Sequence, residues 1–320
     1  MFLVFVLIIF FVETISRTIL NTGMQYDLEM WKYAKYGKQV AMNKEIGHVH
    51  KNNSTFHAMG VDVNINSMGH RDHELSNPKK RNELRLIMVG DSITFGWGVP
   101  QDQTVSARME KILNTGNKKF INVVNTGIGN TNTSMQVEFF IEHAEQLEPD
   151  YVVLNYFIND AEKTPAYKPL NFLSRYSYGY IYMNGRWDTF KRMLQQKKDW
   201  KQYYLDLYNS EAEGWLETQK AIIKLKSYCA ELDIPLLIVN YPEMREFEPY
   251  PFKLITTKIG KIAQTLDISF LDLLPSVSHI DPEELWVTEP DPHPNAKADD
   301  YFAKAITEHL ESAWDYNKRF

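Results

Sequence analysis

The fold is decided by residues 84–92, which read Leu84-Arg85-Leu86-Ile87-Met88-Val89-Gly90-Asp91-Ser92. The first six are apolar apart from Arg85, a pattern typical of a strand that is buried on both faces of a parallel sheet. Ser92 follows the end of this strand, and the carboxyl ends of parallel strands are where such sheets bind ligands. The stretch therefore predicts a buried strand that brings a serine hydroxyl to the ligand-binding edge of a sheet.

Further along the chain, apolar runs of strand length alternate with segments of helical periodicity. We expect strands at 120–125, 151–156, 235–241 and 269–273, and helices at 105–113, 134–146, 215–232 and 296–310. Buried strands that alternate with helices form a parallel sheet covered by helices on both faces, so the fold class is α/β. Residues 161–210 interrupt the alternation, because they contain many aromatic and basic residues and no clear strand.

The overall composition excludes several classes of protein. Of the 320 residues, 44% are hydrophobic and 24% are charged, which is typical of a globular protein and excludes a disordered chain or a multi-span membrane protein. The net charge of −6 argues against a nucleic-acid partner, because such partners are normally bound by basic surfaces. Cys229 is the one cysteine, which excludes an intrachain disulfide and any metal site with two thiolates.

The N-terminal segment Met1–Val12 consists of Met1 and eleven aliphatic or aromatic residues. Because it has no polar face, we expect a membrane anchor rather than a buried helix or strand. Its twelve residues are fewer than the roughly 20 of a complete transmembrane helix, and no basic residue precedes them as in a signal peptide. An anchor with this much soluble chain behind it usually holds an extracytoplasmic domain, so we expect a periplasmic or cell-surface location.

Polar residues follow each of the predicted strand ends. Ser92 comes after the first strand, the glycine-rich loop 125–131 after the second, and Asn159 after the third. Asp291 and His293 precede the last predicted helix. Together they supply a nucleophile, a general base, an orienting carboxylate and donors for an oxyanion, which is the set that acyl transfer by a serine requires.

In their order and spacing, these blocks resemble those of the SGNH (GDSL-type) esterase/lipase superfamily, in its bacterial membrane-anchored type, over residues 84–312. The resemblance implies a three-layer αβα, flavodoxin-like sandwich and ester hydrolysis without a metal or another cofactor. It also implies that Ser92 is the nucleophile, that His293 is the general base, and that Asp291 orients His293.

The resemblance further implies an oxyanion hole, made by the N–H of Ser92, a backbone N–H of the second block and the side-chain amide of Asn159. Asn130 stands where the second block usually has its glycine, so either Gly129 or Asn130 supplies the backbone N–H. Asparagine tolerates the left-handed backbone conformation better than most residues. Phe157 replaces the glycine of the third block, and we expect it to narrow the pocket near the acyl group.

The acid and the base of the last block are two residues apart, whereas many members of the superfamily space them by three. Side chains at i and i+2 of an extended segment point the same way, so Asp291 can reach His293. Prolines at 290, 292 and 294 keep the segment extended or drive it into polyproline II, which would separate the pair. Glu289 is the alternative acid. The two-residue spacing also resembles that of SGNH-like proteins of bacterial exopolysaccharide acetylation.

Five of the nine histidines lie between His48 and His73. The spacings in His48-x-His50 and His70-x-x-His73 are compatible with metal ligands. The segment has no clear helix to fix their geometry, so we expect surface or packing histidines and no metal site.

Residues 66–72 resemble an Asn-x-x-Gly-x-Arg-Asp stretch that lies upstream of the serine block in some bacterial SGNH proteins. We expect this stretch to pack the N-terminal part of the chain on the catalytic core. The alternative is a role of Arg71 in substrate binding.

The chain divides into a membrane anchor or hydrophobic segment at 1–20, an N-terminal extension at 21–82, and an SGNH hydrolase domain at 83–320 with a helical insertion at about 161–210. The aromatic and basic residues of the insertion suit stacking on the sugar rings of a substrate. They equally suit a small helical cap with its own core, and a lid over the cleft would do both.

Three functions are compatible with these features. The first is an esterase that hydrolyses small acyl esters, most plausibly O-acetyl groups on a carbohydrate. The second is an O-acetyltransferase that uses the same catalytic residues to modify an exopolysaccharide or the cell envelope. The third is a non-catalytic envelope scaffold, which Asn130 and Phe157 alone favour. The sequence does not predict the acyl chain length, the alcohol or the oligomeric state.

Overall fold

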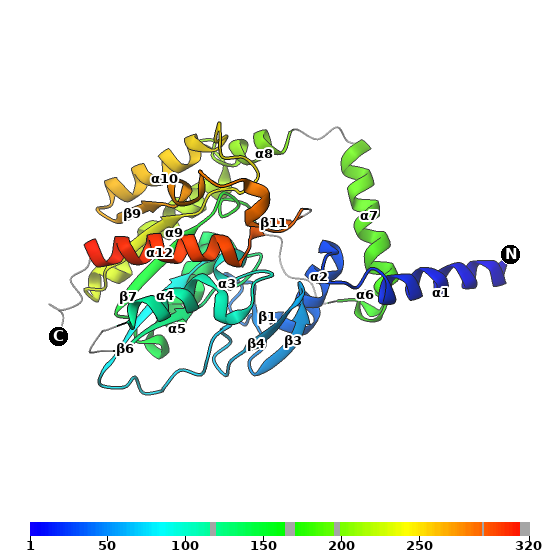
Figure 1. The fold of residues 1–320 in the computed structure, drawn as a ribbon, viewed down its shortest axis with the longest axis horizontal. Coiled ribbons are helices and arrows are strands. Elements are labelled where there is room, and N and C mark those ends of the chain that lie inside the picture. Colours follow the sequence, from blue (N-terminus) through cyan, green and yellow to red (C-terminus); the bar gives the residue numbers. More distant parts are fainter. Residues whose placement is uncertain (116–119, 164–169, 195–198, 290, 314–320) are drawn as a thin grey trace.

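A computed structural model describes residues 1–115, 120–163, 170–194, 199–289 and 291–313, with the backbone alone at 189, 192–194 and 291. At its centre lies a five-stranded parallel sheet with the strand order β6-β5-β7-β8-β9 (Figure 1). Its strands are β5 (Glu83–Val89), β6 (Phe120–Asn125), β7 (Tyr151–Tyr156), β8 (Leu236–Asn240) and β9 (Ser269–Asp272). In chain order this is 2-1-3-4-5, the flavodoxin-like arrangement. The predicted α/β fold is confirmed.

Helices cover both faces of this sheet. One face packs against α5 (Thr133–Leu147), α9 (Glu213–Glu231) and α10 (Lys253–Thr265), and the other against α4 (Val105–Leu113) and α12 (Ala296–Ala313). Successive residues of a strand point to opposite faces, so β5 contributes Ile87 and Val89 to one apolar cluster and Leu86 and Met88 to the other. Burial on both faces explains why β5 is an almost continuous apolar run.

The N-terminal extension forms two short antiparallel ribbons. Its elements are α2 (Tyr26–Lys32), a π-helical turn (Tyr33–Gly37), the ribbon β1 (Lys38–Val40) and β2 (His48–His50), and the ribbon β3 (Ser54–Ala58) and β4 (Val61–Ile65). The segment before it forms α1 (Phe2–Thr18). Tyr33 and Phe56 pack in one apolar cluster with Phe95 and Trp97, which directly follow the predicted nucleophile in the chain. The extension therefore supports the loop that carries Ser92.

The insertion consists of α6 (Phe172–Tyr176), α7 (Tyr178–Leu194) and α8 (Trp200–Leu207). Helix α7 packs against α1 and α2 and stands apart from the sheet (Figure 1). Helix α8 lies at the other end of the insertion, where Trp200 contacts Phe252 next to α10. In the described part of the insertion, α7 therefore packs on the N-terminal helices, whereas α8 packs beside α10 of the catalytic domain. It does not form the small cap with its own core that was one of the two predicted alternatives.

Short elements complete the edge of the sheet at the carboxyl ends of the strands. They are α3 (Ser92–Phe95), a 3₁₀ turn (Gln101–Gln103), α11 (Leu274–Val277), a second 3₁₀ turn (Pro282–Leu285), and the two-stranded ribbon β10 (Trp286–Thr288) and β11 (Asp291–Pro294). This ribbon places the predicted C-terminal block beside α3.

Helix α1 projects from the globular body (Figure 1), and the apolar side chains from Phe2 to Phe11 are 43–83% exposed. Within the described residues, no helix is both long enough and apolar enough to cross a membrane.

Candidate active site

Ser92 lies where β5 turns into α3. Asp91 caps this short helix, because its Oδ1 accepts a hydrogen bond from the N–H of Ile93 at 2.9 Å. The turn also requires a glycine in the neighbouring loop: a Cβ on Gly127 would stand 2.3 Å from the backbone nitrogen of Phe95. The polypeptide of the second block therefore packs directly against the helix that begins with Ser92.

His293 lies on β11 and reaches Ser92 from 201 residues further along the chain, with 2.9 Å between its Nε2 and the Ser92 Oγ. Side-chain contacts on both sides of His293 help to hold this segment. The side-chain amide of Asn295 donates to the carbonyl of Trp286 at 2.9 Å across the ribbon, and the ring of Trp97 lies 5.8 Å from the imidazole ring of His293. The structure thus joins the predicted nucleophile and the predicted base in one hydrogen bond.

The predicted orienting acid is only partly described. Asp291 begins β11, where its backbone pairs with Thr288, and its side chain lies outside the described residues. The alternative acid, Glu289, is exposed in the turn between the two strands.

Asn159 lies in the turn after β7, and its side chain forms a hydrogen bond with the carboxylate of Asp91. Burial raises the pKa of Asp91, while the N–H of Ile93, the nearby His293 and the Asn159 amide oppose this rise. The turn itself is fixed by the buried Asp160, which accepts hydrogen bonds from the N–H of Phe157 at 2.9 Å and from the Gln136 side chain at 2.7 Å. The Asn159 amide is thereby held close to the serine.

The structure distinguishes between the two backbone N–H groups of the second block, those of Gly129 and Asn130, that the sequence offers as oxyanion donors. The N–H of Gly129 donates to the hydroxyl of Tyr33 at 2.9 Å and is therefore occupied. Asn130 adopts the left-handed conformation with φ 62° and lies exposed on the pocket wall. Of the two candidates, the N–H of Asn130 is the one left for a ligand.

These residues line a cavity of about 380 Å³. The cavity also has walls that sequence reasoning missed, namely Tyr26, Met30 and Tyr33 from the extension, Tyr204 from α8, and Glu243 and Arg245 after β8. Glu243 follows the end of the predicted strand at 235–241, so the same strand-end rule that selected Ser92 was capable of finding it. The residues from the extension carry no such sequence signal.

Glu243 and Arg245 form an ion pair at the side of the cavity. Glu243 is almost fully buried. Burial raises the pKa of its carboxyl group, and the contacts with Arg245 oppose this rise. The guanidinium of Arg245 lies 5.0 Å from the ring centre of Trp200. The pair therefore places charged groups and an aromatic ring within reach of a polar substrate.

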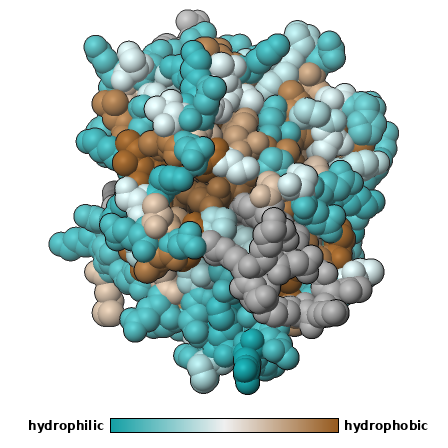
Figure 2. All heavy atoms as spheres, turned by 90° about the vertical axis from the view of Figure 1, so that its left-hand side faces the viewer, coloured by the Kyte–Doolittle hydropathy of each residue, from teal (hydrophilic) through white to brown (hydrophobic). Residues whose placement is uncertain are grey.

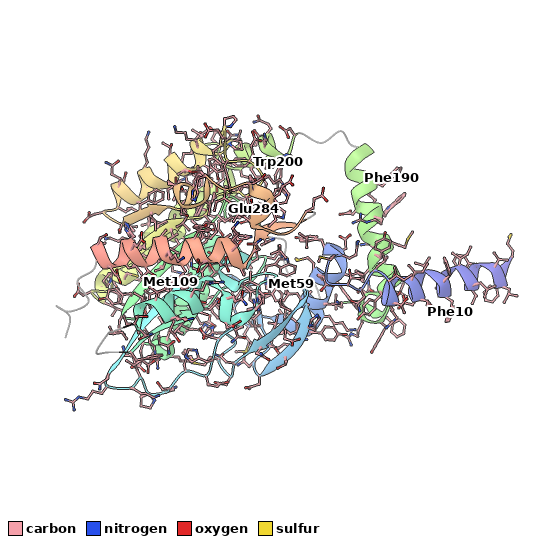
Figure 3. The ribbon with its side chains drawn as sticks, in the orientation of Figure 1. Phe10, Met59, Met109, Phe190, Trp200 and Glu284 are labelled. Atoms are coloured by element: carbon pink, nitrogen blue, oxygen red, sulfur yellow. The ribbon has the colours of Figure 1, made fainter. Side chains whose placement is uncertain are left out.

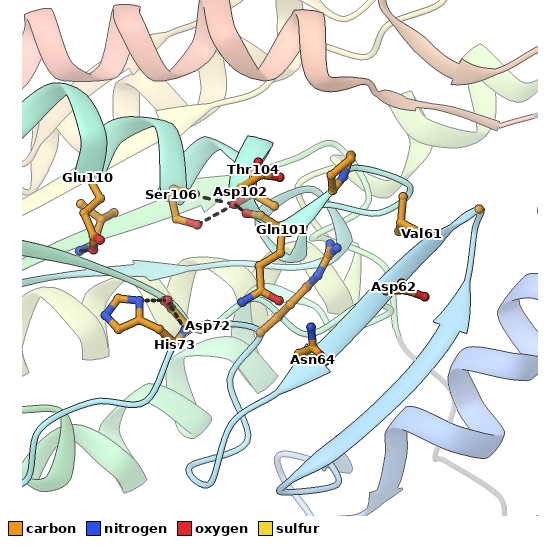
Figure 4. A pocket seen from close by; sticks show the side chains of 15 residues that line it. Val61, Asp62, Asn64, Asp72, His73, Gln101, Asp102, Thr104, Ser106 and Glu110 are labelled. Atoms are coloured by element: carbon orange, nitrogen blue, oxygen red, sulfur yellow. Dashed lines mark hydrogen bonds and ion pairs between the residues drawn. The ribbon is translucent and has the colours of Figure 1, made fainter.

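A second, larger cavity of about 670 Å³ has a lining that includes Asp72, His73, Gln101 and Glu110 (Figure 4). It contains an ion pair in which His73 Nδ1 lies 2.8 Å from an oxygen of Asp72, and this contact raises the pKa of His73 to about 9. Its lining contains neither Ser92 nor His293. Within the described residues, no group of three His, Cys, Asp or Glu side chains is arranged to hold a metal ion.

Arg71 itself is buried and faces the protein interior. Its guanidinium donates to the carbonyls of Phe95 at 3.1 Å, Gly96 at 2.5 Å and Val99 at 2.7 Å. The next residue, Asp72, accepts a hydrogen bond from the N–H of Asn125 at 2.8 Å. This arrangement agrees with the predicted packing role of residues 66–72 and leaves Arg71 no contact with the catalytic cavity.

Comparisons with known proteins show the family of the chain. The model of the GDSL-like Lipase/Acylhydrolase family matches residues 88–301, and a search of the curated proteins finds no match. Among solved structures, an alpha/beta hydrolase enzyme from the metagenome of Lake Arreo is 15% identical with a TM-score of 0.49, over 71% of this chain and 95% of that one. A variant of an acetyl-xylooligosaccharide esterase from Geobacillus Stearmophilus is 17% identical with a TM-score of 0.46, over 73% of this chain and 95% of that one. A lipase/acylhydrolase from Enterococcus faecalis is 12% identical with a TM-score of 0.44, over 72% of this chain and 96% of that one.

Proposed function

The chain belongs to the GDSL-like lipase/acylhydrolase family, which makes it a carboxylic-ester hydrolase, and we propose that it is a serine esterase that removes small acyl groups, O-acetyl groups in the first instance, from a carbohydrate. The observation that carries the proposal is the 2.9 Å contact between Ser92 Oγ and His293 Nε2 on the wall of the cavity. A serine that hydrogen-bonds a histidine beside free amide donors is the arrangement that acyl transfer needs.

In the proposed reaction, the Nε2 of His293 takes the proton of Ser92 while the Oγ attacks the ester carbonyl. The negative charge that forms on the carbonyl oxygen is met by the N–H groups of Ser92 and Asn130 and by the side-chain amide of Asn159. His293 then gives the proton to the leaving alcohol, which yields an acyl-enzyme on Ser92. Water, activated by the same imidazole, releases the acid and restores the serine. Asp291 is proposed to orient His293 from β11.

The residues that line the cavity favour an ester that consists of a small acyl group and a sugar alcohol. Phe157 and Trp97 line it close to Ser92, where a longer acyl chain would have to lie. Tyr26 and Tyr204 provide aromatic faces, and Glu243 with Arg245 provides polar groups, the combination that sugar hydroxyls and sugar rings require.

An active-site probe followed by a series of esters tests this function. We expect a fluorophosphonate to label Ser92 in the wild-type protein. We also expect kcat/KM to fall at least about tenfold from p-nitrophenyl acetate to p-nitrophenyl octanoate, because the additional methylene groups of octanoate would have to displace the cavity wall, and even one extra methylene in a tight pocket is worth about that much. Release of acetate from acetylated glycans is measured beside the series. A protein that is not labelled contradicts the serine mechanism, and one that prefers octanoate contradicts the small acyl group.

The transferase alternative shares the first half-reaction. If an unacetylated glycan is added and the acetyl group moves to it faster than to water, the acyl-enzyme serves transfer rather than hydrolysis. We expect free acetate as the main product.

We further propose that helices α1, α6 and α7, here called the membrane unit, attach the enzyme to a lipid bilayer. A helix that is apolar on all sides suits lipid, because a protein partner would cover only one side of it. Helix α7 crosses α1 (Figure 1) and exposes Trp187 by 56% and Phe190 by 48%. Phe190 stands on the side of α7 that faces away from the sheet (Figure 3). Exposed aromatic side chains beside Lys191 are typical of the bilayer interface.

Polar contacts of Arg17 and Glu13 join α1 to the other helices of the membrane unit, and Arg17 donates to the carbonyl of Tyr176 at 2.5 Å. The carboxylate of Glu13 accepts hydrogen bonds from the Ser177 hydroxyl at 2.7 Å and from the N–H groups of Tyr178 at 3.1 Å and Gly179 at 2.8 Å. Because α1 and α7 are held together there, both are expected to meet the same bilayer. The opposite end of the molecule is mostly hydrophilic, with a hydrophobic band across part of it (Figure 2).

Sedimentation with vesicles tests the attachment. We expect wild-type protein to sediment with phosphatidylethanolamine/phosphatidylglycerol vesicles, and the double variant Phe5→Glu, Phe10→Glu to lose at least about 100-fold in binding, since an acidic side chain in the hydrocarbon costs about 3 kcal/mol. Hydrolysis of soluble p-nitrophenyl acetate is expected to stay unchanged. Ile223→Glu, at an exposed apolar position of α9, is the matched control and is expected to sediment like the wild type. Wild-type protein that stays in the supernatant, or that forms oligomers through α1 instead, contradicts the proposal.

A further inference from the structure

The ribbon β1–β2 presents a buried polar face to the loop that carries Asn130. In its register Lys38 pairs with His50 and Val40 with His48, so the side chains of Lys38, His48 and His50 share one face. All three are at least 96% buried, at 4%, 1% and 1% exposure. Lys38 and His48 contact Gly129, the residue before the proposed oxyanion donor, and His50 is linked to Gly129 through the hydroxyl of Tyr33.

The carbonyl oxygen of Gly129 is held by two donors from this face. Lys38 Nζ donates to it at 2.5 Å, and His48 Nε2 lies 3.1 Å from it. Because a carbonyl oxygen only accepts, the Nε2 of His48 carries the proton in this contact. Both lone pairs of the oxygen are thereby used.

The N–H of Gly129 is held by a second chain of hydrogen bonds with a defined direction. His50 Nδ1 lies 2.9 Å from the carbonyl of Gly69 and must donate to it, so its Nε2 is an acceptor. The hydroxyl of Tyr33 donates to that Nε2 at 2.7 Å, and its oxygen accepts from the N–H of Gly129 at 2.9 Å. The peptide groups on both sides of Gly129 are therefore fixed.

This fixation determines where the next N–H points. The carbonyl of Gly129 and the N–H of Asn130 belong to one planar trans peptide, so they point in opposite directions. With the carbonyl aimed at the buried ribbon, the N–H of Asn130 is aimed away from it, on the side of the catalytic cavity that Asn130 lines. Within the described part of the chain, this N–H has no hydrogen-bond partner.

Lys38 is costly for folding. Among the described residues it forms no ion pair with a carboxylate, and burial lowers its pKa to about 7. An unpaired ammonium in the protein interior loses its hydration, and replacing such groups by apolar ones of similar size is often neutral or stabilising. No ion pair therefore accounts for its place in the interior, where it contacts the ring of Tyr33 at 4.4 Å and the carbonyl of the Gly129–Asn130 peptide.

We propose that Lys38 and His48 are positioning residues for catalysis, which aim and polarise the Asn130 N–H by binding the carbonyl of its own peptide group. A hydrogen bond to the carbonyl of an amide strengthens its N–H as a donor. The inference rests on the proposed function, because it needs an oxyanion to form opposite Asn130.

Two substitutions at the ribbon test it. We expect Lys38→Met to lower kcat on p-nitrophenyl acetate about 10- to 100-fold with KM within twofold, below the about 10²- to 10³-fold cost of losing an oxyanion donor outright. We expect the melting temperature to stay the same or to rise, since the buried ammonium is removed. His48→Leu is expected to lower kcat about 3- to 10-fold, and His48→Gln, which keeps a donor near the Nε2 position, to restore it.

Gln39→Met is the matched control, because this exposed neighbour of Lys38 lies on the other face of β1; it is expected to behave like the wild type. Unchanged kcat in both Lys38→Met and His48→Leu overturns the inference, as does a fall in kcat that is matched by a fall in melting temperature in every variant. Failure of the proposed function is distinguishable, because the wild-type protein itself then neither hydrolyses the ester nor reacts with the fluorophosphonate.

Discussion

Ser92→Ala is expected to lower kcat on p-nitrophenyl acetate by at least about 10⁴-fold, because without the hydroxyl no acyl-enzyme can form and only the oxyanion donors and substrate binding remain. The hydroxyl is buried against His293, and it has no role in the hydrophobic core. The melting temperature is therefore expected to change little. The measurement is the initial rate of p-nitrophenol release, together with a thermal melt.

Ser312→Ala is a suitable control for this prediction, because that serine lies on the exposed end of α12, where its hydroxyl donates to the carbonyl of His309 in the same helix. Activity of Ser92→Ala near the wild-type level, with p-nitrophenyl acetate still consumed at a saturable site, shows that another nucleophile acts. It would also remove the basis for the proposed roles of Asn130 and Asn159.

The second large effect concerns stability. Arg71→Met is expected to lower the free energy of unfolding by about 3 to 5 kcal/mol, because it leaves three buried carbonyl groups without the hydrogen-bond donor that Arg71 provides, at about 1 to 3 kcal/mol each. The groups left behind are the carbonyls of Phe95, Gly96 and Val99, which surround the C-terminal end of α3. Burial lowers the pKa of Arg71 to about 10, so the guanidinium is still charged at neutral pH. A loss of this size lowers the melting temperature by about 10 °C in a domain of this length.

Urea unfolding of Arg71→Met beside Arg81→Met measures this difference. Arg81 is exposed, so its loss is expected to stay within about 0.5 kcal/mol. If the two variants unfold at the same urea concentration, the carbonyls near α3 do not depend on Arg71. A loss of substrate affinity without a loss of stability would instead support the predicted alternative of a substrate contact.

The sequence was sufficient for the sheet and for the pairing of serine with histidine. Strand β5 is recognisable because burial on both faces leaves little room for polar residues, and Ser92 follows from the rule that ligands bind at strand ends. The role of His293 was implied by the resemblance of its block to that of the SGNH superfamily. Strand β8 was expected at 235–241, and in the structure it begins one residue later and ends one residue earlier. That deviation is small because a buried strand is limited by the polar residues around it.

The contribution of the N-terminal extension was not predictable in the same way. Its strands have three to five residues, and their burial depends on the loops that they cover rather than on their own periodicity. Lys38 in a short strand suggests a solvent-exposed edge, and the paired histidines suggest a surface. Only the position of Gly129 in three dimensions explains why these polar side chains are buried.

The polar ribbon beneath Gly129 also bears on how relatives of this protein are compared. The family match begins at residue 88, whereas Tyr33, Lys38 and His48 all precede it. Two enzymes with the same serine, asparagine and histidine blocks can therefore differ in turnover because different N-terminal segments hold the same loop. We therefore expect a catalytic fragment that begins at residue 83 to keep Ser92 and His293 but to turn over more slowly, because it would lose the proposed support of Asn130.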